Sequence, residues 1–285
     1  MDFASFTLAH ETAIRLGFFA GSLVVVAAWE VWAPRRAPTI AKTVRWFGNL
    51  ALVALNSLLL RLLFPLAAVG MAAFAATSGW GALNHFQVPP WLAVPVALIA
   101  LDFAIWLQHV VMHAVPALWR LHRVHHADLD YDLTTGVRFH PIEIVLSTLI
   151  KFAAINLLGP PVAAVVLFEV LLNVTSMFNH GNIRLGAAWD RALRWIVVTP
   201  DMHRVHHSVE DDEANSNFGF NLPWWDRLFG TYRDQPRAGH EAMTIGIHGH
   251  RDPDEVARLP GLLVLPFRGE DDGYPINQRD WHATR

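Results

Sequence analysis

Three histidine clusters stand out among the 16 histidines of this 285-residue chain. The second and third share one pentapeptide, His-Arg-Val-His-His, although they lie far apart in the sequence. Helix positions i, i+3 and i+4 share a face, and neutral imidazole is the commonest protein ligand for zinc, copper, iron and nickel. We therefore expect each triplet to direct its imidazoles toward a common metal. The clusters are His109/His113, His122/His125/His126 and His203/His206/His207.

The number of clustered histidines exceeds what a single ion needs, because zinc, for example, typically takes four ligands. We therefore expect two ions. The Glu-x-x-His pairs of carboxylate-bridged di-iron bundles do not occur in the sequence. A site made of neutral imidazoles leaves the metal charge uncompensated, so nearby carboxylates are expected behind the ligands. The candidates are Asp128, Asp130, Glu143, Asp201 and Asp226, although a solvated surface acid is the competing interpretation for each.

Composition places the chain in a membrane. It is 53% hydrophobic and only 16% charged, which is too apolar for an ordinary soluble domain. A net charge of −3 gives no reason to expect nucleic acid as a partner. The absence of cysteine excludes disulfides, thiolate zinc sites and iron–sulfur clusters.

The apolar residues form five runs, which predict an all-α membrane protein with a transmembrane bundle of four to five helical segments. The first three are long enough to cross a hydrocarbon core of about 30 Å. The last two flank Gly159-Pro160-Pro161 and are shorter, so we expect a crossing hairpin, with a shallow re-entrant pair as the alternative. The runs cover residues 13–32, 46–76, 91–115, 142–158 and 162–178.

Charge predicts the orientation. The loop after the first run carries Arg35, Arg36, Lys42 and Arg45, whereas residues 77–90 carry no Asp, Glu, Lys or Arg. By the positive-inside rule the first loop is cytoplasmic. Counting crossings from there puts every histidine cluster on the cytoplasmic side, in a histidine-rich helical cap.

Two single histidines join the candidate ligands because they flank the hairpin at the depth expected for the clusters. His140 precedes the fourth run and His180 follows the fifth. We divide the chain into N-terminal transmembrane helices at residues 1–90, a catalytic region at 91–235 and a C-terminal tail at 236–285. The tail contains a short apolar stretch, residues 259–267, that could lie on the membrane surface.

The chain resembles the fatty acid hydroxylase/sterol desaturase superfamily of integral membrane oxygenases, and within it the bacterial branch labelled "sterol desaturase family". The family pattern His-x3-His, His-x2-His-His and a later His-x2-His-His stands here as His109-Val-Val-Met-His113, His122-Arg-Val-His-His126 and His203-Arg-Val-His-His207. The segments Asn215-Ser-Asn-Phe-Gly219 and Trp225-Asp-Arg-Leu-Phe-Gly-Thr-Tyr232 also match. The match covers roughly residues 95–235.

The resemblance implies two non-haem iron ions, dioxygen as co-substrate and a lipid substrate that is hydroxylated or desaturated, in a multi-pass protein of the bacterial inner membrane. It makes ligand candidates of ten histidines: His109, His113, His122, His125, His126, His140, His180, His203, His206 and His207. It does not choose among a fatty acyl, sterol or ether lipid, nor between hydroxylation, desaturation and ether cleavage.

Aromatic residues near the clusters are candidates for the substrate pocket, although their helical spacing equally suits packing. They are Trp106, Trp119, Phe139 and Phe178. The sequence shows no flavin, haem or nucleotide-binding segment, so we expect electrons from a separate donor, either a ferredoxin or a b-type cytochrome with its reductase. Arg123 and Arg204 are candidate exposed contacts for an acidic donor, with plain solvation as the alternative.

Three other functions remain open at this point. Imidazoles also suit zinc, so a membrane di-zinc hydrolase that cleaves lipid esters is one. Paired histidines that bind haem in a non-enzymatic cytochrome are another. A metal transporter is the third, although it would need ligands near the bilayer midplane.

Overall fold

The computed structural model describes residues 3–269 and Ile276. In that part of the chain the regular secondary structure is helical, apart from two isolated β-bridges, Pro34 with Ile183 and Ser208 with Ile245. Five segments are long and apolar enough to cross a membrane, as the apolar runs predicted. They contain α1 Phe3–Trp32, α2 Lys42–Leu63, α3 Ala67–Thr77, α4 Ala82–His85, α5 Pro90–Ala114, α7 Pro141–Leu158 and α8 Val162–Asn179.

The second apolar run is divided into the two helices α2 and α3. Helix α2 ends at Leu63, and Phe64 and Pro65 follow directly. Proline disfavours helical backbone at the residue before it and lacks the N–H that would continue the helix. The first residue of α3, Ala67, has a φ of 49°. The two helices together still form one candidate span.

The fourth and fifth runs form a helical hairpin. Helices α7 and α8 each have 18 residues, which corresponds to about 27 Å at 1.5 Å per residue. The turn between them depends on Gly159, which has a φ of 65° and ends α7 in the left-handed conformation. A Cβ at Gly159 would lie 2.4 Å from the Trp80 carbonyl oxygen, so the turn packs tightly against the segment before α4. Both helices qualify as candidate spans.

The bundle is closed by apolar packing between its helices. Helix α1 lies along α8, and α5 packs against both α7 and α8. Buried apolar residues of α3, α5, α7 and α8 form one continuous core. Among them are Val69, Leu101, Ile155 and Phe168.

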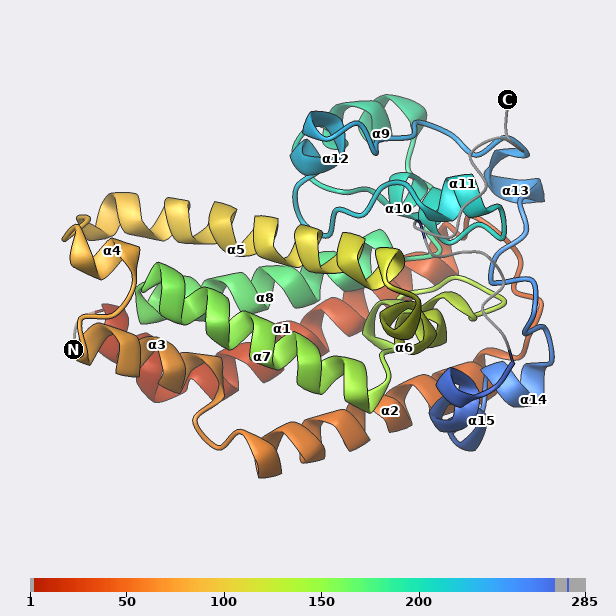
Figure 1. Cartoon of the computed structure of the whole chain (residues 1–285). Helices are drawn as coiled ribbons and strands as arrows, with labels where there is room; N and C mark the ends of the chain where they lie inside the picture. The colour runs from red at the N-terminus through yellow and green to blue at the C-terminus, as the bar shows by residue number, and fades with distance from the viewer. Residues whose placement is uncertain (1–2, 270–275, 277–285) are drawn as a thin grey trace.

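A cap of short helices covers one end of this bundle (Figure 1). Helices α1, α5 and α8 end there, and α2 and α7 begin there, so a helical cap at one end is confirmed. Its elements are α6 Pro116–His126, η1 Thr135–Val137, α9 Ala187–Leu193, α10 Pro200–His206, α11 Asp211–Ala214, α12 Trp224–Leu228, α13 Gly239–Ala242, α14 Pro253–Val256, α15 Leu259–Val264 and η2 Leu265–Phe267.

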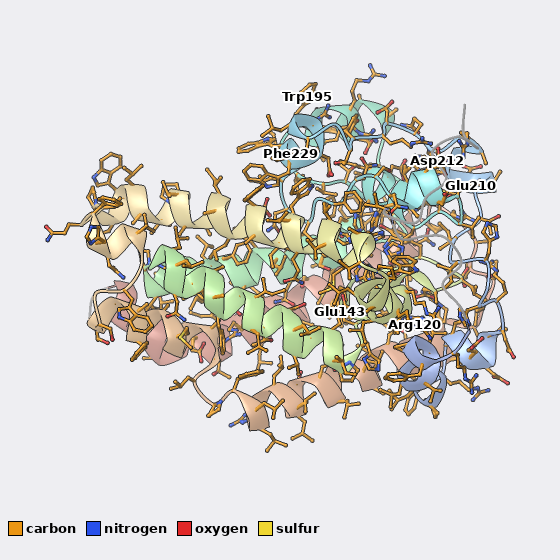
Figure 2. All side chains as sticks on the ribbon, in the orientation of Figure 1. Arg120, Glu143, Trp195, Glu210, Asp212 and Phe229 are labelled. Atoms are coloured by element: carbon orange, nitrogen blue, oxygen red, sulfur yellow. The ribbon has the colours of Figure 1, made fainter. Side chains whose placement is uncertain are left out.

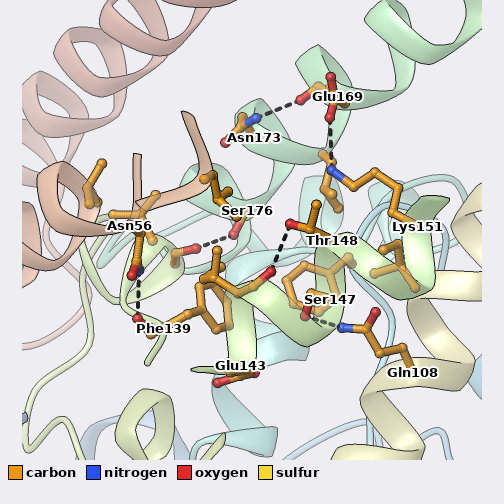
Figure 3. A pocket seen from close by; sticks show the side chains of 18 of the residues that line it. Asn56, Gln108, Phe139, Glu143, Ser147, Thr148, Lys151, Glu169, Asn173 and Ser176 are labelled. Carbon is orange, nitrogen blue, oxygen red and sulfur yellow. Dashed lines mark hydrogen bonds and ion pairs between the residues drawn. The ribbon is translucent and has the colours of Figure 1, made fainter. Parts of the chain in front are cut away.

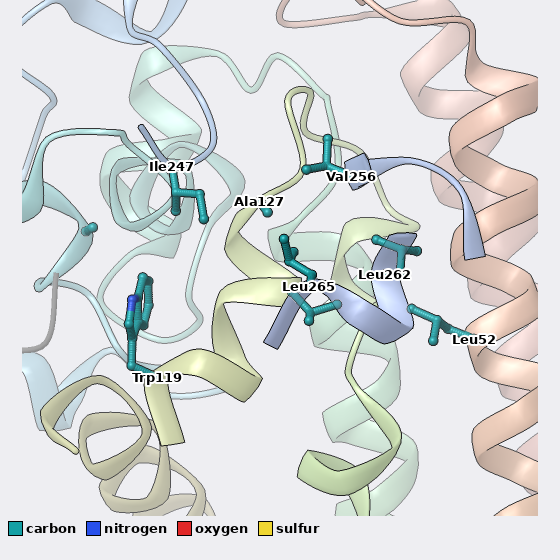
Figure 4. Packing of buried hydrophobic residues seen from close by; sticks show 9 residues of the cluster. Leu52, Trp119, Ala127, Ile247, Val256, Leu262 and Leu265 are labelled. Atoms are coloured by element: carbon teal, nitrogen blue, oxygen red, sulfur yellow. The ribbon is translucent and has the colours of Figure 1, made fainter. Parts of the chain in front are cut away.

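The described part of the C-terminal tail packs into the cap (Figure 4). Leu262 and Leu265 are fully buried, in one cluster with Leu52 of α2 and Trp119 of α6. The stretch 259–267 therefore packs through its buried face against protein, and Phe267 is left exposed. Helix α2 comes so close that a Cβ at Gly48 would lie 2.1 Å from the Ala257 carbonyl oxygen.

Buried charges connect the bundle to the cap. Arg45 of α2 donates from Nε and Nη2 to Asp128, at 2.7 Å each, and from Nη1 to Asp132 at 2.6 Å. Burial alone would raise the pKa of Asp128, but Arg45 and Arg138 outweigh it and hold that pKa at about 2. The loop between α6 and η1 is thereby fixed to α2, directly after two of the clustered histidines.

Candidate metal centre

Nine of the ten candidate histidines converge where the bundle meets the cap. Their ring nitrogens form two groups, within each of which the ligand atoms lie no more than 4.8 Å apart. Every one of these side chains is buried, with no residue more than 3% exposed. The five-histidine group is His109, His113, His122, His126 and His206, and the four-histidine group is His125, His180, His203 and His207.

The three histidines of each repeated pentapeptide divide between the two groups, contrary to the expectation from helical spacing that each triplet binds one metal. His122 and His126, at i and i+4, enter the five-histidine group, while His125, at i+3, enters the other. In the second copy the pair His203 and His207 enters the four-histidine group, and His206 crosses over. Neighbouring positions on a helical face diverge by about 100° per residue, so each copy reaches both groups.

The geometry fits metal ions. Nε2 of His206 lies 3.0 Å from Nε2 of His109. Both rings hold their Nδ1 atoms 2.7 Å from backbone carbonyl oxygens, those of Ser216 and Phe218. A carbonyl only accepts, so both Nδ1 atoms carry the proton and both Nε2 atoms present lone pairs. Two facing lone pairs at this distance repel each other unless a cation lies between them.

The other close nitrogen pairs agree with the same interpretation. The Nε2 atoms of His113 and His126 are 3.1 Å apart, those of His180 and His203 are 3.1 Å apart, and those of His180 and His125 are 3.2 Å apart. Two nitrogen ligands at 2.0–2.1 Å from one ion are about 2.9 Å apart when they bind at right angles and about 3.3 Å apart at the tetrahedral angle. The donor set and its spacing therefore suit bound metal.

Burial keeps the imidazoles neutral, as ligands must be. It lowers the pKa of His180 to about 3. Burial, together with the other histidines, holds the pKa well below its usual value for His125, His126, His203, His206 and His207. Near neutral pH these rings offer lone pairs rather than positive charge.

His140 lies outside both groups. Its Nδ1 accepts a hydrogen bond from the Ile142 backbone N–H at 3.2 Å, which caps the start of α7. Its Nε2 lies 3.3 Å from the Leu263 carbonyl oxygen in the tail. This histidine therefore joins helix α7 to the cap, away from the other nine.

Glu143 is the acid that contacts a grouped histidine. Its Oε1 lies 2.6 Å from Nδ1 of His122, with both side chains buried, and Figure 2 places it at the junction of bundle and cap. A carboxylate on Nδ1 fixes the ring orientation and the tautomer, and it makes Nε2 a stronger donor to a metal.

The remaining acids act at a greater distance. Asp226 accepts from the backbone N–H groups of Phe218 and Gly219, at 2.9 and 2.8 Å, and so holds the segment whose carbonyl binds His109. Asp128 binds Arg45, as described above. Asp201 pairs with Arg204. Asp130 accepts from the backbone N–H of Thr39 and so holds the loop between α1 and α2.

Of the four aromatic pocket candidates, Phe139 lines the cavity next to the histidines. It also stacks on His125, with ring centroids 4.6 Å apart. Trp119 is buried against His113 and His126. Trp106 donates to Asp226 at 3.0 Å, and Phe178 packs beside Trp29 in a groove between α1 and α8. None of these three lines the cavity that Phe139 lines.

A cavity of about 400 Å³ runs from the five-histidine group into the bundle (Figure 3). His109 and His122 reach it, and α1, α2, α5, α7 and α8 supply most of the rest of its wall. That volume lies within the usual range for small-molecule sites. The wall is unexpectedly polar for a membrane bundle, with Asn56, Gln108, Ser147, Thr148, Asn173 and Ser176.

Charged residues also line this cavity. Glu169 of α8 pairs with Lys151 at 2.9 Å and with Arg15 at 2.8 Å. Arg15 and Lys151 lie within the first and fourth apolar runs of the sequence. Ionisable residues inside a membrane segment are costly and commonly mark a functional path, so that signal was available in the sequence.

The expectation that Arg123 and Arg204 are exposed is wrong. Arg123 is 1% exposed and Arg204 is fully buried. Arg123 donates to the Leu265 carbonyl at 2.8 Å, and Arg204 pairs with Asp201 and lies over the Tyr131 ring. Both hold the cap together, so neither is placed to meet an electron donor.

Comparison with known proteins agrees with the histidine geometry. Ornithine lipid hydroxylase OlsE of Rhizobium tropici is 30% identical over 62% of this chain and 53% of its own length. Alkylglycerol monooxygenase of Xenopus tropicalis is 31% identical over 54% of this chain and 34% of its own. Fatty acid hydroxylase vlmA of a Lecanicillium species is 28% identical over 51% and 43%.

The chain thus matches about half the length or less of these curated relatives. No solved structure gives a significant match. The sequence profile of the fatty acid hydroxylase family matches residues 94–231, which contain all nine grouped histidines, most of helix α5 and all of α6, α7 and α8. Residues 94–231 are thus similar to the fatty acid hydroxylase family, as are the curated relatives in part of their length.

Proposed function

We propose that the chain is a membrane-bound non-haem di-iron oxygenase that hydroxylates or desaturates a lipid with dioxygen and external electrons. The observation that carries this proposal is the facing pair of Nε2 lone pairs on His109 and His206. They belong to one of two neighbouring imidazole groups in a fatty acid hydroxylase domain.

The chain's residues have distinct tasks in this proposal. The five-histidine and four-histidine groups would each hold one iron ion, and the two ions would supply the redox chemistry that lets dioxygen attack an unactivated C–H bond. Glu143 holds His122 in one tautomer. Apolar wall residues such as Ile105, Met112 and Phe139 keep water away from a lipid carbon placed beside His109 and His122.

A lipid substrate follows from the surroundings of the site. The cavity lies within a bundle whose segments suit a membrane, and the relatives are named for acting on an ornithine lipid, on alkylglycerol and on a fatty acid. We propose the cytoplasmic face of a bacterial inner membrane as the location, because the basic loop Arg35–Arg45 shares the end of the bundle that carries the histidines. A ferredoxin or a b-type cytochrome with its reductase would supply the electrons.

The test is lipid mass spectrometry of cells that express the chain under ¹⁸O₂, compared with cells that express a His109→Ala variant. Hydroxylation adds one labelled oxygen atom to a lipid, and desaturation removes two hydrogens. We expect one of these changes in the wild type and none in the variant, together with non-haem iron in the purified protein.

Other results would redirect the proposal. Two zinc ions after anaerobic purification, with oxygen-independent lipid cleavage, would establish the hydrolase instead. A Soret absorption band that is lost when the clustered histidines are substituted would establish a cytochrome. A His109→Ala variant with full metal content and full activity contradicts a metal centre at this position.

A further inference from the structure

The cavity beside the five-histidine group contains hydrogen-bond acceptors that lack donors. Asn56 Oδ1, Gln108 Oε1 and Glu143 Oε2 are buried atoms with no hydrogen-bond partner in the part of the chain that the structure describes. All three residues line the cavity, and Figure 3 shows them around it. An unsatisfied buried acceptor is costly, so three around one cavity point to a ligand that supplies donors.

The orientation of Asn56 is determined by its neighbour. Its Nδ2 donates to the Phe139 carbonyl oxygen at 2.8 Å, and a carbonyl cannot donate in return. The amide therefore cannot be flipped, and Oδ1 is the atom left over. Asn56 is only 6% exposed, so bulk solvent does not supply the missing donor, and the residue lines the cavity.

Glu143 and Gln108 extend this acceptor set across the cavity. Glu143 uses Oε1 on His122, which leaves Oε2 beside the five-histidine group. Gln108 of α5 donates through Nε2 to Ser147 of α7 at 2.7 Å, and its Oε1 remains. The acceptors thus come from α2, α5 and α7, all in the lining of the cavity that His109 and His122 reach.

The charged residues that line the cavity do not require an anionic ligand. Arg15 pairs with Glu11 as well as with Glu169, and Lys151 pairs with Glu169. Two cations thus meet two carboxylates. Within the described residues the unmet requirement of this cavity is for donors rather than for negative charge.

We propose that the cavity binds a neutral lipid polar group with hydrogen-bond donors, a hydroxyl or an amide N–H, on Asn56, Gln108 and Glu143. The substrate class is then an amphiphile whose polar group lies close to the oxidised carbon, rather than a plain hydrocarbon chain. This inference deepens the proposed function, because it takes the cavity as that enzyme's lipid site.

Binding of matched probes tests the proposal without turnover. The metal-loaded chain in phosphatidylcholine nanodiscs, with no electron donor, is titrated with dodecanol and with undecyl methyl ether, which have equal numbers of heavy atoms. A second pair is dodecanamide and N,N-dimethyldecanamide. The shift of the thermal unfolding midpoint with probe mole fraction gives each affinity.

We expect dodecanol or dodecanamide, which carry a hydrogen-bond donor, to bind about fivefold or more tighter than the matched probe without a donor. One satisfied acceptor has about that effect on affinity. Preference within the alcohol pair alone would identify a hydroxyl, and within the amide pair alone an amide N–H. Equal binding within both pairs would overturn the proposal, whether or not lipid oxidation is observed. A clear preference without lipid oxidation would leave this site standing and remove the oxygenase.

Variants locate the effect. Asn56→Leu and Gln108→Met each remove an acceptor, and we expect the donor preference to fall several-fold in at least one. Asn156→Leu is the control, because Asn156 also has an unpartnered Oδ1 and donates to a backbone carbonyl, but lies outside the cavity lining. An unchanged preference in both cavity variants, or the same loss in the control, would refute the assignment.

Discussion

The five-histidine and four-histidine groups are built in different ways. In the five-histidine group, His109, His113, His122 and His206 each have Nδ1 on an oxygen acceptor. In the four-histidine group only His180 does, with Nδ1 2.7 Å from the Ser176 carbonyl oxygen. The Nδ1 atoms of the other three members, His125, His203 and His207, have no partner in the described chain.

Ring packing takes the place of hydrogen bonds in the four-histidine group. His125 stacks on Phe139, and Tyr131 lies beside His180 and His207, with centroids 5.5 and 5.0 Å away. Hydrogen bonds define the direction of a lone pair more narrowly than packing does. The group that opens to the cavity, through His109 and His122, is therefore the one whose ligands are oriented most firmly.

This difference suggests unequal roles for the two groups. The five-histidine group is preorganised and faces the proposed lipid site, while the four-histidine group lies behind it. Contacts between the groups are close, since the rings of His126 and His207 stack at 4.6 Å. Substitutions that affect one group at a time test whether the difference matters.

The largest effect on turnover and iron content is expected from alanine substitutions at two adjacent histidines, one from each group. His206→Ala leaves four histidines in its group, and His207→Ala leaves three in the other. Both should lower oxygen-dependent turnover about a hundredfold or more, since ligand loss exceeds the 10–100-fold cost of an outer partner. Iron should fall further in His207→Ala, toward about one ion per chain, because four ligands commonly suffice to hold a metal.

Elemental analysis of both variants, purified in parallel, measures this. Neighbouring residues share any general cost to folding, so each variant controls for the other. Equal iron losses, or the larger loss in His206→Ala, would contradict the difference drawn between the groups.

A smaller effect is expected at Glu143, which supports the five-histidine group alone. Glu143→Ala leaves Nδ1 of His122 without its acceptor, and loss of such a partner typically costs 10–100-fold in metal affinity or activity. Glu143→Gln retains an acceptor oxygen and should recover part of the loss. Metal affinity from chelator competition is the measurement, and an unaffected Glu143→Ala variant would show that the ring is held by packing alone.

The smallest effect is expected from a glycine beside the four-histidine group. A Cβ at Gly136 would lie 2.5 Å from the Ser176 carbonyl oxygen and 2.9 Å from Nδ1 of His180. Gly136→Ala must therefore displace His180, and we expect a loss of about 1–3 kcal/mol of stability from overpacking, with several-fold lower activity.

Gly186→Ala is the matched control for that change. Gly186 has a φ of −63°, and the nearest atom to an added Cβ there is 3.8 Å away, so its unfolding midpoint should not fall. Comparable midpoints for both variants would mean that His180 has room to move.

Much of the arrangement could be predicted from residue types alone. The apolar runs predicted the membrane helices because burial of about 20 consecutive apolar residues has few other solutions. The histidine spacing predicted ligand faces because α-helical geometry is local. The break between α2 and α3 lies at Pro65, a residue type that interrupts helices. The polar cavity wall could not be predicted, because its residues are scattered over several apolar runs.

The sequence by itself determined that the three histidine clusters would meet at one end of a helical bundle, because hydrophobic length and loop charge order the helices. Only the tertiary structure decided which imidazoles lie together in each group and that His140 is in neither group. It also decided that Arg123 and Arg204 are buried. Such pairings depend on how separate helices approach and rotate against one another, and no local spacing encodes that.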